Sequence, residues 1–530
     1  MRVLVAIAAL ALAFVAGARE ALVAQRFLVA AAHPLAAETG AEVLKRGGSA
    51  VDAAIAVQAM LGLVEPESSG IGGGAFMLHW SAAEKRLRSY DGRETAPAAA
   101  KPDRFMKDGK PLAFLDAAVG GQSVGVPGVL RMLELAHQRH GKLPWPDLFA
   151  AAIRVAYDGF EPTPKLRAAL ARERHLREDP AARWIYYSGG RIINREYAET
   201  LRAIARGGAG VFYEGDIARD IVLTVRAHAK PGDLTEDDLR NYRALEREPV
   251  CGPYRQRRVC STGPPSSGGI AVLQILGILE RTGFARAPPE SAAALHLFAE
   301  AGKLAYADRA RYLGDPAFVP VPTQTLLSLA YLDKRAKLVS DRAMPLAPPG
   351  DAEAGTSHFS IVDARGDIVS MTTTIEDAFG SRVMVRGFLL NNQLTDFNFE
   401  PGGANGVAPG KRPRSSMAPA VVFQKGEPVL ALGSPGGSMI INYVAKALVG
   451  TLDWGLGLQA AFELPNFGSR NGPTLVEQNT RLEGRSGELQ ALGHQVESIP
   501  LQSGLHGIER VPQGWRGGAD PRRDGAVRGE

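Results

Sequence analysis

The stretch "GTSHFSIVDARGDIVSMTTT", residues 355–374, predicts two β-strands joined by a turn. Its two halves are rich in β-branched and apolar residues, and "DARGD" between them is typical of a turn. The small-residue run "DAEAG" comes directly before, so Thr356 stands at the leading edge of the first strand. A threonine is ordinary at the start of a strand, and the local pattern therefore predicts a hairpin and no more.

The two sides of this hairpin differ in their predicted secondary structure. Further short β-prone runs follow it ("GFLLNN", "AVVFQ", "VLALGS"), and then "NYVAKALVGTL" and "SGELQALG" predict helices. The preceding half is helix-rich: "GGSAVDAAIAVQAMLGLVEP" begins with a capping box formed by Ser49 and Asp52, and "ALHLFAEAGKLAYADRARYLGDP" has an apolar helical face that ends by Pro316. No regular βαβ alternation is present. The order predicts an α+β fold of packed layers with an antiparallel sheet.

Composition limits the classes of partner. The 530 residues are 45% hydrophobic and 22% charged, with a net charge of +5 that is scattered along the chain. No basic stripe with interleaved aromatic residues is present, so we expect no nucleic-acid partner.

The N-terminus predicts export. "MRVLVAIAALALAFVAGARE" has one early positive charge, an apolar run and an A-x-A signal at residues 16–18. We therefore expect residues 1–18 to be a signal peptide and the protein to be periplasmic or secreted, without stable membrane insertion after its removal. An uncleaved membrane anchor is the alternative.

The two cysteines, Cys251 and Cys260, lie in "PVCGPYRQRRVC". If Arg255 and Gln256 form a two-residue hairpin turn, the cysteines face each other as a non-hydrogen-bonded pair, where Cβ atoms come closest. A disulfide and two buried thiols both remain open. Metal binding is disfavoured, because no histidine or second cysteine pair is nearby in the sequence.

Several loops carry polar groups suited to chemistry. "GSPGGS", residues 433–438, follows a β-run and opens a helical run, so its amides could bind an anion or an oxyanion, or simply form a tight turn. "KRPRSSMAP", "NNQLTDF" and "DGRETAP" hold polar clusters that are more often turn caps than ligand sites. No Ser-His-Asp set and no G-x-S-x-G elbow is present.

Taken together, these segments resemble the γ-glutamyltransferase family of N-terminal-nucleophile hydrolases. The matching pieces occur in the family's order and cover nearly all of the chain beyond the signal. They are "SSGIGGGAFML", "DGRETAPAAA", "GVPGVL", "PPSSGGI", "YADRARYLGDP", "GTSHFSIVD", "GFLLNNQLTDF", "KRPRSSMAP" and "GSPGGSMII".

The resemblance implies a four-layer αββα sandwich and a precursor that cuts itself between Gly355 and Thr356. Residues 19–355 would form a large subunit and 356–530 a small one, both within one domain. After the cut, the free α-amine of Thr356 could serve as the general base beside its own hydroxyl, which would explain why no histidine base is evident.

Site roles follow from the same resemblance. The expected catalytic residues are Thr356, Thr374 as its hydrogen-bond partner, and the oxyanion-hole residues Gly436 and Gly437. The α-carboxylate of a γ-glutamyl donor is expected at Arg93, Ser415 and Ser416, and its α-ammonium at Gln393 and Asp396. Glu376 replaces an asparagine found in many members and should support ammonium binding. No metal and no organic cofactor is implied.

The implied partners are a γ-glutamyl donor such as glutathione and either water or an amino-acid or peptide acceptor. The segment "NFEPGGANGVAPG" is shorter than the lid-bearing loop of many members, so an open site is expected. Two alternatives remain: an amidase like the cephalosporin and glutaryl acylases, and a non-catalytic exported binding protein. Arg93, Glu376 and Asp396 oppose the acylase, because an acyl group without an amine would leave the two carboxylates unpaired.

Overall fold

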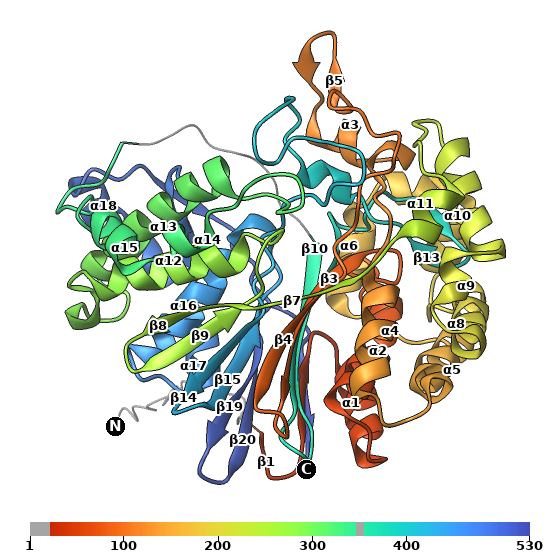
Figure 1. The fold of residues 1–530 in the computed structure, drawn as a ribbon, viewed down its shortest axis with the longest axis horizontal. Coiled ribbons are helices and arrows are strands. Elements are labelled where there is room, and N and C mark those ends of the chain that lie inside the picture. Colours follow the sequence, from red (N-terminus) through yellow and green to blue (C-terminus); the bar gives the residue numbers. More distant parts are fainter. Residues whose placement is uncertain (1–21, 346–354) are drawn as a thin grey trace, which may run out of the picture.

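Two large β-sheets lie face to face between two layers of helices (Figure 1). The computed structural model describes residues 22–345 and 355–530. Every strand pairing within the two large sheets is antiparallel, so the predicted α+β layers are confirmed. The expected signal peptide, residues 1–18, lies outside the described residues.

Each large sheet has seven strands. In spatial order the first sheet contains β1 (Val23–Ala24), β20 (Gly514–Ala519), β19 (His506–Val511), β15 (Glu427–Gly433), β14 (Ala420–Gln424), β9 (Arg257–Ser261) and β8 (Val250–Tyr254). The second contains β21 (Ala526–Gly529), β2 (Leu28–Ala31), β10 (Gly355–Val362), β11 (Ile368–Glu376), β3 (Gly74–Ser81), β4 (Arg86–Asp91) and β7 (Leu245–Arg247).

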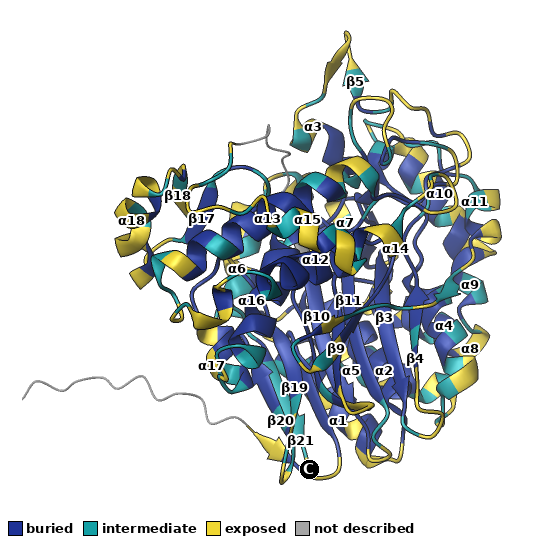
Figure 2. Cartoon of the chain, turned by 60° about the vertical axis from the view of Figure 1, so that its left-hand side comes forward, coloured by how far each residue is buried: buried dark blue, intermediate teal, exposed yellow. Residues whose placement is uncertain are grey.

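The predicted hairpin is β10 and β11, in the middle of the second sheet. Thr356 pairs with Thr374, and the register shifts between Gly355 and Thr356. All of β11 is buried, as are the neighbouring strands (Figure 2). The β-branched and apolar residues of both strands therefore serve two cores, one facing the helices and one facing the other sheet.

Three cores hold the layers together. Between the sheets, residues such as Trp80 and Val362 pack against Phe423 and Ile508. The outer face of the second sheet packs on α1 (Pro34–Lys45), α2 (Ala50–Val64) and α4 (Val129–His140); α5 (Ala150–Asp158) packs on α2, and α8 (Arg195–Gly207) packs on α5. The outer face of the first sheet packs on α12 (Gly268–Glu280), α16 (Ile440–Leu452) and α17 (Leu458–Glu463), and α13 (Ala292–Tyr312) packs on α12.

Local signals set the ends of these helices. The predicted capping box is present at α2, where the Ser49 side chain accepts from Asp52 N and the Asp52 side chain accepts from Ser49 N. α13 ends at Tyr312, shortly before Pro316.

The cysteine hairpin forms in the predicted register. Cys251 pairs with Cys260 across β8 and β9, the two Cα atoms are 4.1 Å apart, and a disulfide joins the side chains. The disulfide therefore closes the outermost hairpin of the first sheet.

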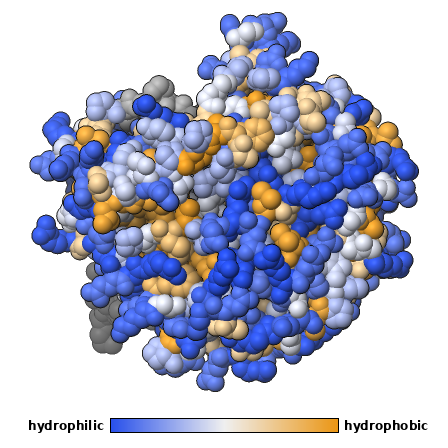
Figure 3. Space-filling view, in the orientation of Figure 1, coloured by the Kyte–Doolittle hydropathy of each residue, from blue (hydrophilic) through white to orange (hydrophobic). Residues whose placement is uncertain are grey.

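The visible surface is mostly hydrophilic, with apolar residues in small scattered groups (Figure 3). Within the described residues, no helix is both long and apolar enough to cross a membrane.

Candidate active site

Thr356 lines a cavity of about 410 Å³. Thr374 and Gly437 also line it, as do most of the residues that the sequence predicted. The predicted residues in its wall are Arg93, Glu376, Gln393, Asp396, Ser415 and Ser416. Residues from six separate parts of the chain are thus brought together in one cavity.

The hydroxyl of Thr356 faces that of Thr374, with 3.5 Å between the two Oγ1 atoms. Thr374 Oγ1 in turn accepts a hydrogen bond from the amide of Glu376 at 2.8 Å. The carbonyl of Thr356 accepts from Arg523 at 3.1 Å. Thr356, the first residue of the expected small subunit, is therefore held through both its hydroxyl and its carbonyl.

The glycine loop runs from the end of β15 into α16. Gly436 and Gly437 both have positive φ, 126° and 55°. A Cβ atom on Gly436 would lie 2.5 Å from Cε2 of Tyr443, so a side chain there would clash as well as strain the backbone. Gly437 lines the Thr356 cavity, whereas Gly436 lines the adjoining one.

The acidic end of the cavity is already bonded internally. Asp396 accepts from Gln393 at 2.7 Å and from Arg93 at 2.5 Å. Burial, followed by the charges of Asp396 and Asp377, raises the pKa of Glu376 well above its ordinary value. This shift favours the protonated form of Glu376, and a bound ammonium would favour the ionised one.

Arg93 is fully buried and faces inward. Its guanidinium also donates to the carbonyls of Pro413 and Arg414, and Nη1 lies 3.6 Å from Glu94. The expectation that Asp396 would lie unpaired without a substrate amine is therefore wrong, because Arg93 neutralises it. An acyl group without an amine would therefore not leave Asp396 unpaired.

Two arginines in the cavity wall, Arg309 and Arg414, were not predicted. Arg309 donates to the hydroxyl of Ser416 at 2.8 Å, so it stands beside one of the expected carboxylate ligands. Burial lowers the pKa of both guanidinium groups, and for Arg414 the neighbouring Arg309 adds to the effect. Neither forms an ion pair with any described acidic residue, which suits both to a bound carboxylate.

The sequence does not single out Arg309 and Arg414 as site residues, for a physical reason. Arg309 lies near the polar end of a helix and Arg414 in a proline-containing loop, positions where a charged side chain is ordinary. Only the packing of α13 against the loop before β14 brings them to the cavity.

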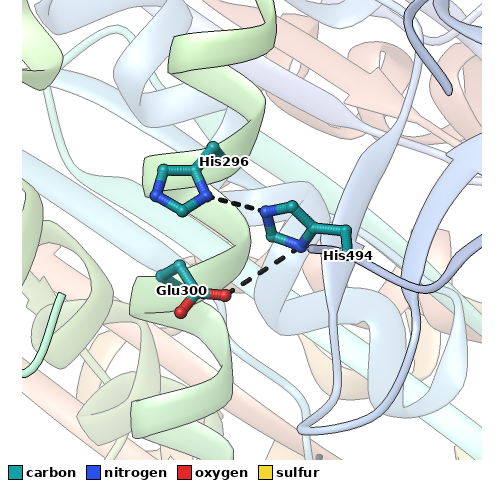
Figure 4. Close-up of side chains that lie close together, drawn as sticks. All are labelled: His296, Glu300 and His494. Atoms are coloured by element: carbon teal, nitrogen blue, oxygen red, sulfur yellow. Dashed lines mark hydrogen bonds and ion pairs between the residues drawn. The ribbon is translucent and has the colours of Figure 1, made fainter. Parts of the chain in front are cut away.

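Within the described part of the chain, one group of potential metal ligands lies close together: His296, Glu300 and His494 (Figure 4). The two rings are hydrogen-bonded to each other at 2.7 Å, and Glu300 binds the ammonium of Lys303 at 2.8 Å. These atoms already have partners, so the cluster is satisfied by hydrogen bonds and a cation of the protein itself.

The family model described as gamma-glutamyltranspeptidase matches residues 36–530. The chain belongs to the γ-glutamyltranspeptidase family. Its members carry the αββα fold of N-terminal-nucleophile hydrolases, which the two sheets and their helical layers reproduce.

Individual members of the γ-glutamyltranspeptidase family match over most of their length. The glutathione hydrolase proenzyme of Bacillus subtilis (strain 168) is 37% identical, over 95% of this chain and 91% of that protein. The acylase ACY 1 proenzyme of Pseudomonas sp. (strain V22) is 36% identical, over 93% and 91%. The crystal structure of the cephalosporin acylase from Bacillus halodurans has a TM-score of 0.86 at 28% identity and covers 97% of both chains.

Proposed function

We propose that this member of the family is a self-processing γ-glutamyl hydrolase and transferase with Thr356 as its nucleophile. The observation that carries the proposal is the position of the Thr356 hydroxyl: it meets Thr374 at 3.5 Å in a cavity that also contains Gly437 and a set of carboxylate-binding groups. A buried nucleophile beside an anion-binding loop suits acyl transfer.

Processing comes first. Oγ1 of Thr356 attacks the carbonyl carbon of Gly355, the C–N bond between the two residues breaks, and an ester joins Gly355 to the hydroxyl. Water hydrolyses the ester. The products are a carboxylate on Gly355 and a free α-amine on Thr356.

Turnover then uses both groups of Thr356. The hydroxyl attacks the γ-carbonyl of the donor, the α-amine takes the hydroxyl proton and passes it to the departing amine, and a γ-glutamyl ester remains. Amide groups of Gly436 and Gly437 stabilise the oxyanion. Water or an acceptor amine attacks the ester and regenerates the hydroxyl.

The polar ends of the cavity suit the α-groups of a glutamyl donor. Ser415, Ser416 and Arg309 would bind the carboxylate, with Arg93 reorganising to share it. Asp396, Gln393 and Glu376 would receive the ammonium. Ionisation of Glu376 then gives that end a second negative charge.

A second candidate, an amidase for glutaryl-type acyl groups, is favoured by one observation. Arg93 donates to Asp396, and burial favours the protonated form of Glu376, so an acyl group without an amine need not leave a bare carboxylate in the cavity. The acylases among the relatives fit this reading.

Gel electrophoresis under denaturing conditions tests processing. Wild-type protein should give two bands, the smaller beginning at Thr356, and Thr356→Ala should give one band and no activity. A wild-type protein that stays uncut after prolonged incubation would remove the proposed mechanism.

Comparison of γ-glutamyl-p-nitroanilide with glutaryl-p-nitroanilide separates the two donors. We expect the larger kcat/KM for the γ-glutamyl compound. A larger value for the glutaryl compound would assign the acylase function instead.

A further inference from the structure

Three charged or titratable side chains on one face of α13 contact the main chain of an irregular segment, residues 339–345, that follows α15 (Leu329–Ala336). They are His296, Glu300 and Lys303, spaced four and three residues apart and buried to at least 96%. This segment is the last described part of the chain before Gly355.

The contacts hold four main-chain atoms of the segment. His296 Nε2 binds Ser340 O at 2.7 Å, Glu300 accepts from Met344 N at 2.8 Å, and Lys303 donates to Met344 O at 3.3 Å. Ala343 N donates to Leu492 O at 2.9 Å. Met344 is thus fixed through both its amide and its carbonyl, independently of its side chain.

The two histidines form a directional chain of hydrogen bonds. A carbonyl only accepts, so Nε2 of His296 carries a hydrogen. With both rings neutral, His494 Nε2 donates to His296 Nδ1 at 2.7 Å, and Thr474 donates to His494 Nδ1 at 2.8 Å. Every ring nitrogen is used, which leaves none for a metal. Burial, Lys303 and His296 lower the pKa of His494 to about 4, in keeping with a neutral ring.

A buried ion pair is a costly way to fix a loop that has no other task. Glu300 and Lys303 are 0% and 3% exposed at the side chain, and apolar packing would generally stabilise such a place as well or better. Hydrogen bonds to the main chain, however, fix direction as well as position. The arrangement therefore suits a segment whose path matters.

We propose that His296, Glu300 and Lys303 are positioning residues for the self-cleavage before Thr356, and that turnover by the cut enzyme does not need them. The inference rests on the proposed function, because it presupposes the cut. Residues 339–345 would act as the fixed point from which the chain enters the site.

Chain length alone gives a small effect. From Met344 to Gly355 there are 355 − 344 = 11 residues, whereas from the end of α15 at Ala336 there are 355 − 336 = 19. Because the entropy cost of closing a loop grows with its length, the longer segment would bring Gly355 to the site about twofold less often. A loss of direction at the reacting carbonyl can cost far more, on the order of 10-fold or above.

The experiment follows the cut fraction with time during cell-free synthesis of the full chain. Glu300→Gln, Lys303→Met and the pair together should slow cleavage about 10-fold. The pair removes both charges, so it avoids an unpaired buried charge that could block folding. Per cut molecule, kcat and KM for γ-glutamyl-p-nitroanilide should stay within about twofold of wild type. Lys303→Arg, which keeps the charge, should restore much of the cleavage rate.

Leu201→Ala is the control for lost stability, because Leu201 is a buried residue of α8 in the core on the outer face of the second sheet, whereas Val339 and Met344 pack against the core on the other side of the molecule. It should lower the Tm. At the same loss of Tm, it should slow cleavage less than the Glu300 and Lys303 variants do. Three results would overturn the positioning role. The control could slow cleavage as much as the Glu300 and Lys303 variants at the same Tm, those variants could slow cleavage by twofold or less, or their kcat could fall in parallel with the cleavage rate. Wild-type protein that is not cut would instead overturn the proposed function.

Discussion

At the scale of single residues, the site depends on side chains whose state is set by burial. Glu376 and Glu94 are both buried carboxyl groups, and both lack a hydrogen-bond partner on at least one described oxygen. Sequence places Glu94 in a polar loop and Glu376 directly after the second predicted strand, and it says nothing of their protonation. Their protonation follows from their distance to water and to Asp396 or Arg93, which only the fold decides.

Glu376→Gln should change the pH dependence of donor binding. The pKa of Glu376 is raised in the free enzyme, so below that pKa a donor ammonium must displace the proton, and wild-type affinity should rise with pH through this range. The variant cannot ionise, and its KM should be about 10-fold higher above that pKa and nearly flat with pH. KM for γ-glutamyl-p-nitroanilide measured across pH checks this. Parallel profiles would contradict it.

Glu94→Gln should change the pH dependence of stability. Burial raises the pKa of Glu94 to about 8 from an ordinary 4.5, so between these values the folded state keeps a proton that the unfolded state has lost. Wild-type stability should therefore fall as pH rises, by about 1.4 kcal/mol per unit from this group. The Tm of the variant should gain on wild type from pH 5 to pH 8. A constant difference across that range would show that Glu94 does not titrate there.

At the scale of elements, two junctions place the reacting groups: the start of β10 and the loop from β15 into α16. β10 pairs with β11 along its whole length and with β2 only from Phe359 to Val362, so its start is held by β11 on one side. The glycine loop turns sharply because Gly436 and Gly437 take a left-handed backbone next to Tyr443. The sequence predicts the start of a strand at the first place and a tight turn or an anion-binding loop at the second, and the neighbouring strands give each its direction.

Gly436→Ala should lose most activity and some stability. Its φ of 126° and the 2.5 Å approach of a Cβ to Tyr443 leave no strain-free position for a methyl group, at a cost of about 1–3 kcal/mol. Gly426→Ala is the control, because Gly426 also has positive φ, 84°, but its Cβ would meet nothing within 4 Å. Both should lower the Tm, and only the first should lower kcat. Equal kcat values would mean that the loop tolerates displacement.

At the scale of the whole molecule, the two expected subunits are interleaved. In the second sheet, β11, β21 and all of β10 except its first residue, Gly355, come from the expected small subunit, and β2, β3, β4 and β7 come from the expected large one. The first sheet is mixed in the same way. A cut before Thr356 breaks one peptide bond and leaves the pairings of Thr356 and all later residues in place.

The cut protein should therefore behave as one particle. Native size-exclusion chromatography should give a single peak containing both fragments, and they should separate only in denaturant, because neither half has a complete sheet of its own. Separate elution of the fragments under native conditions would contradict this. An uncut Thr356→Ala protein, eluting at the same volume, is the reference.

The sequence alone determined the fold class, the order of the elements and most members of the site. The runs rich in β-branched and apolar residues, the Ser49 capping box and the cysteine register are local patterns, and the structure forms the strands, the cap and the pairing that they predict. The family resemblance supplied the cavity residues from Arg93 to Gly437.

Tertiary structure alone decided how those residues are used. It pairs Arg93 with Asp396, raises the pKa of Glu376, adds Arg309 and Arg414 to the cavity, and joins His296 to Ser340 and Glu300 to Met344. Each of these depends on burial and on contacts between residues far apart in the chain. Such interactions have no periodic signal in sequence, because the energy of a charge is set by the solvent and the charges around it in space.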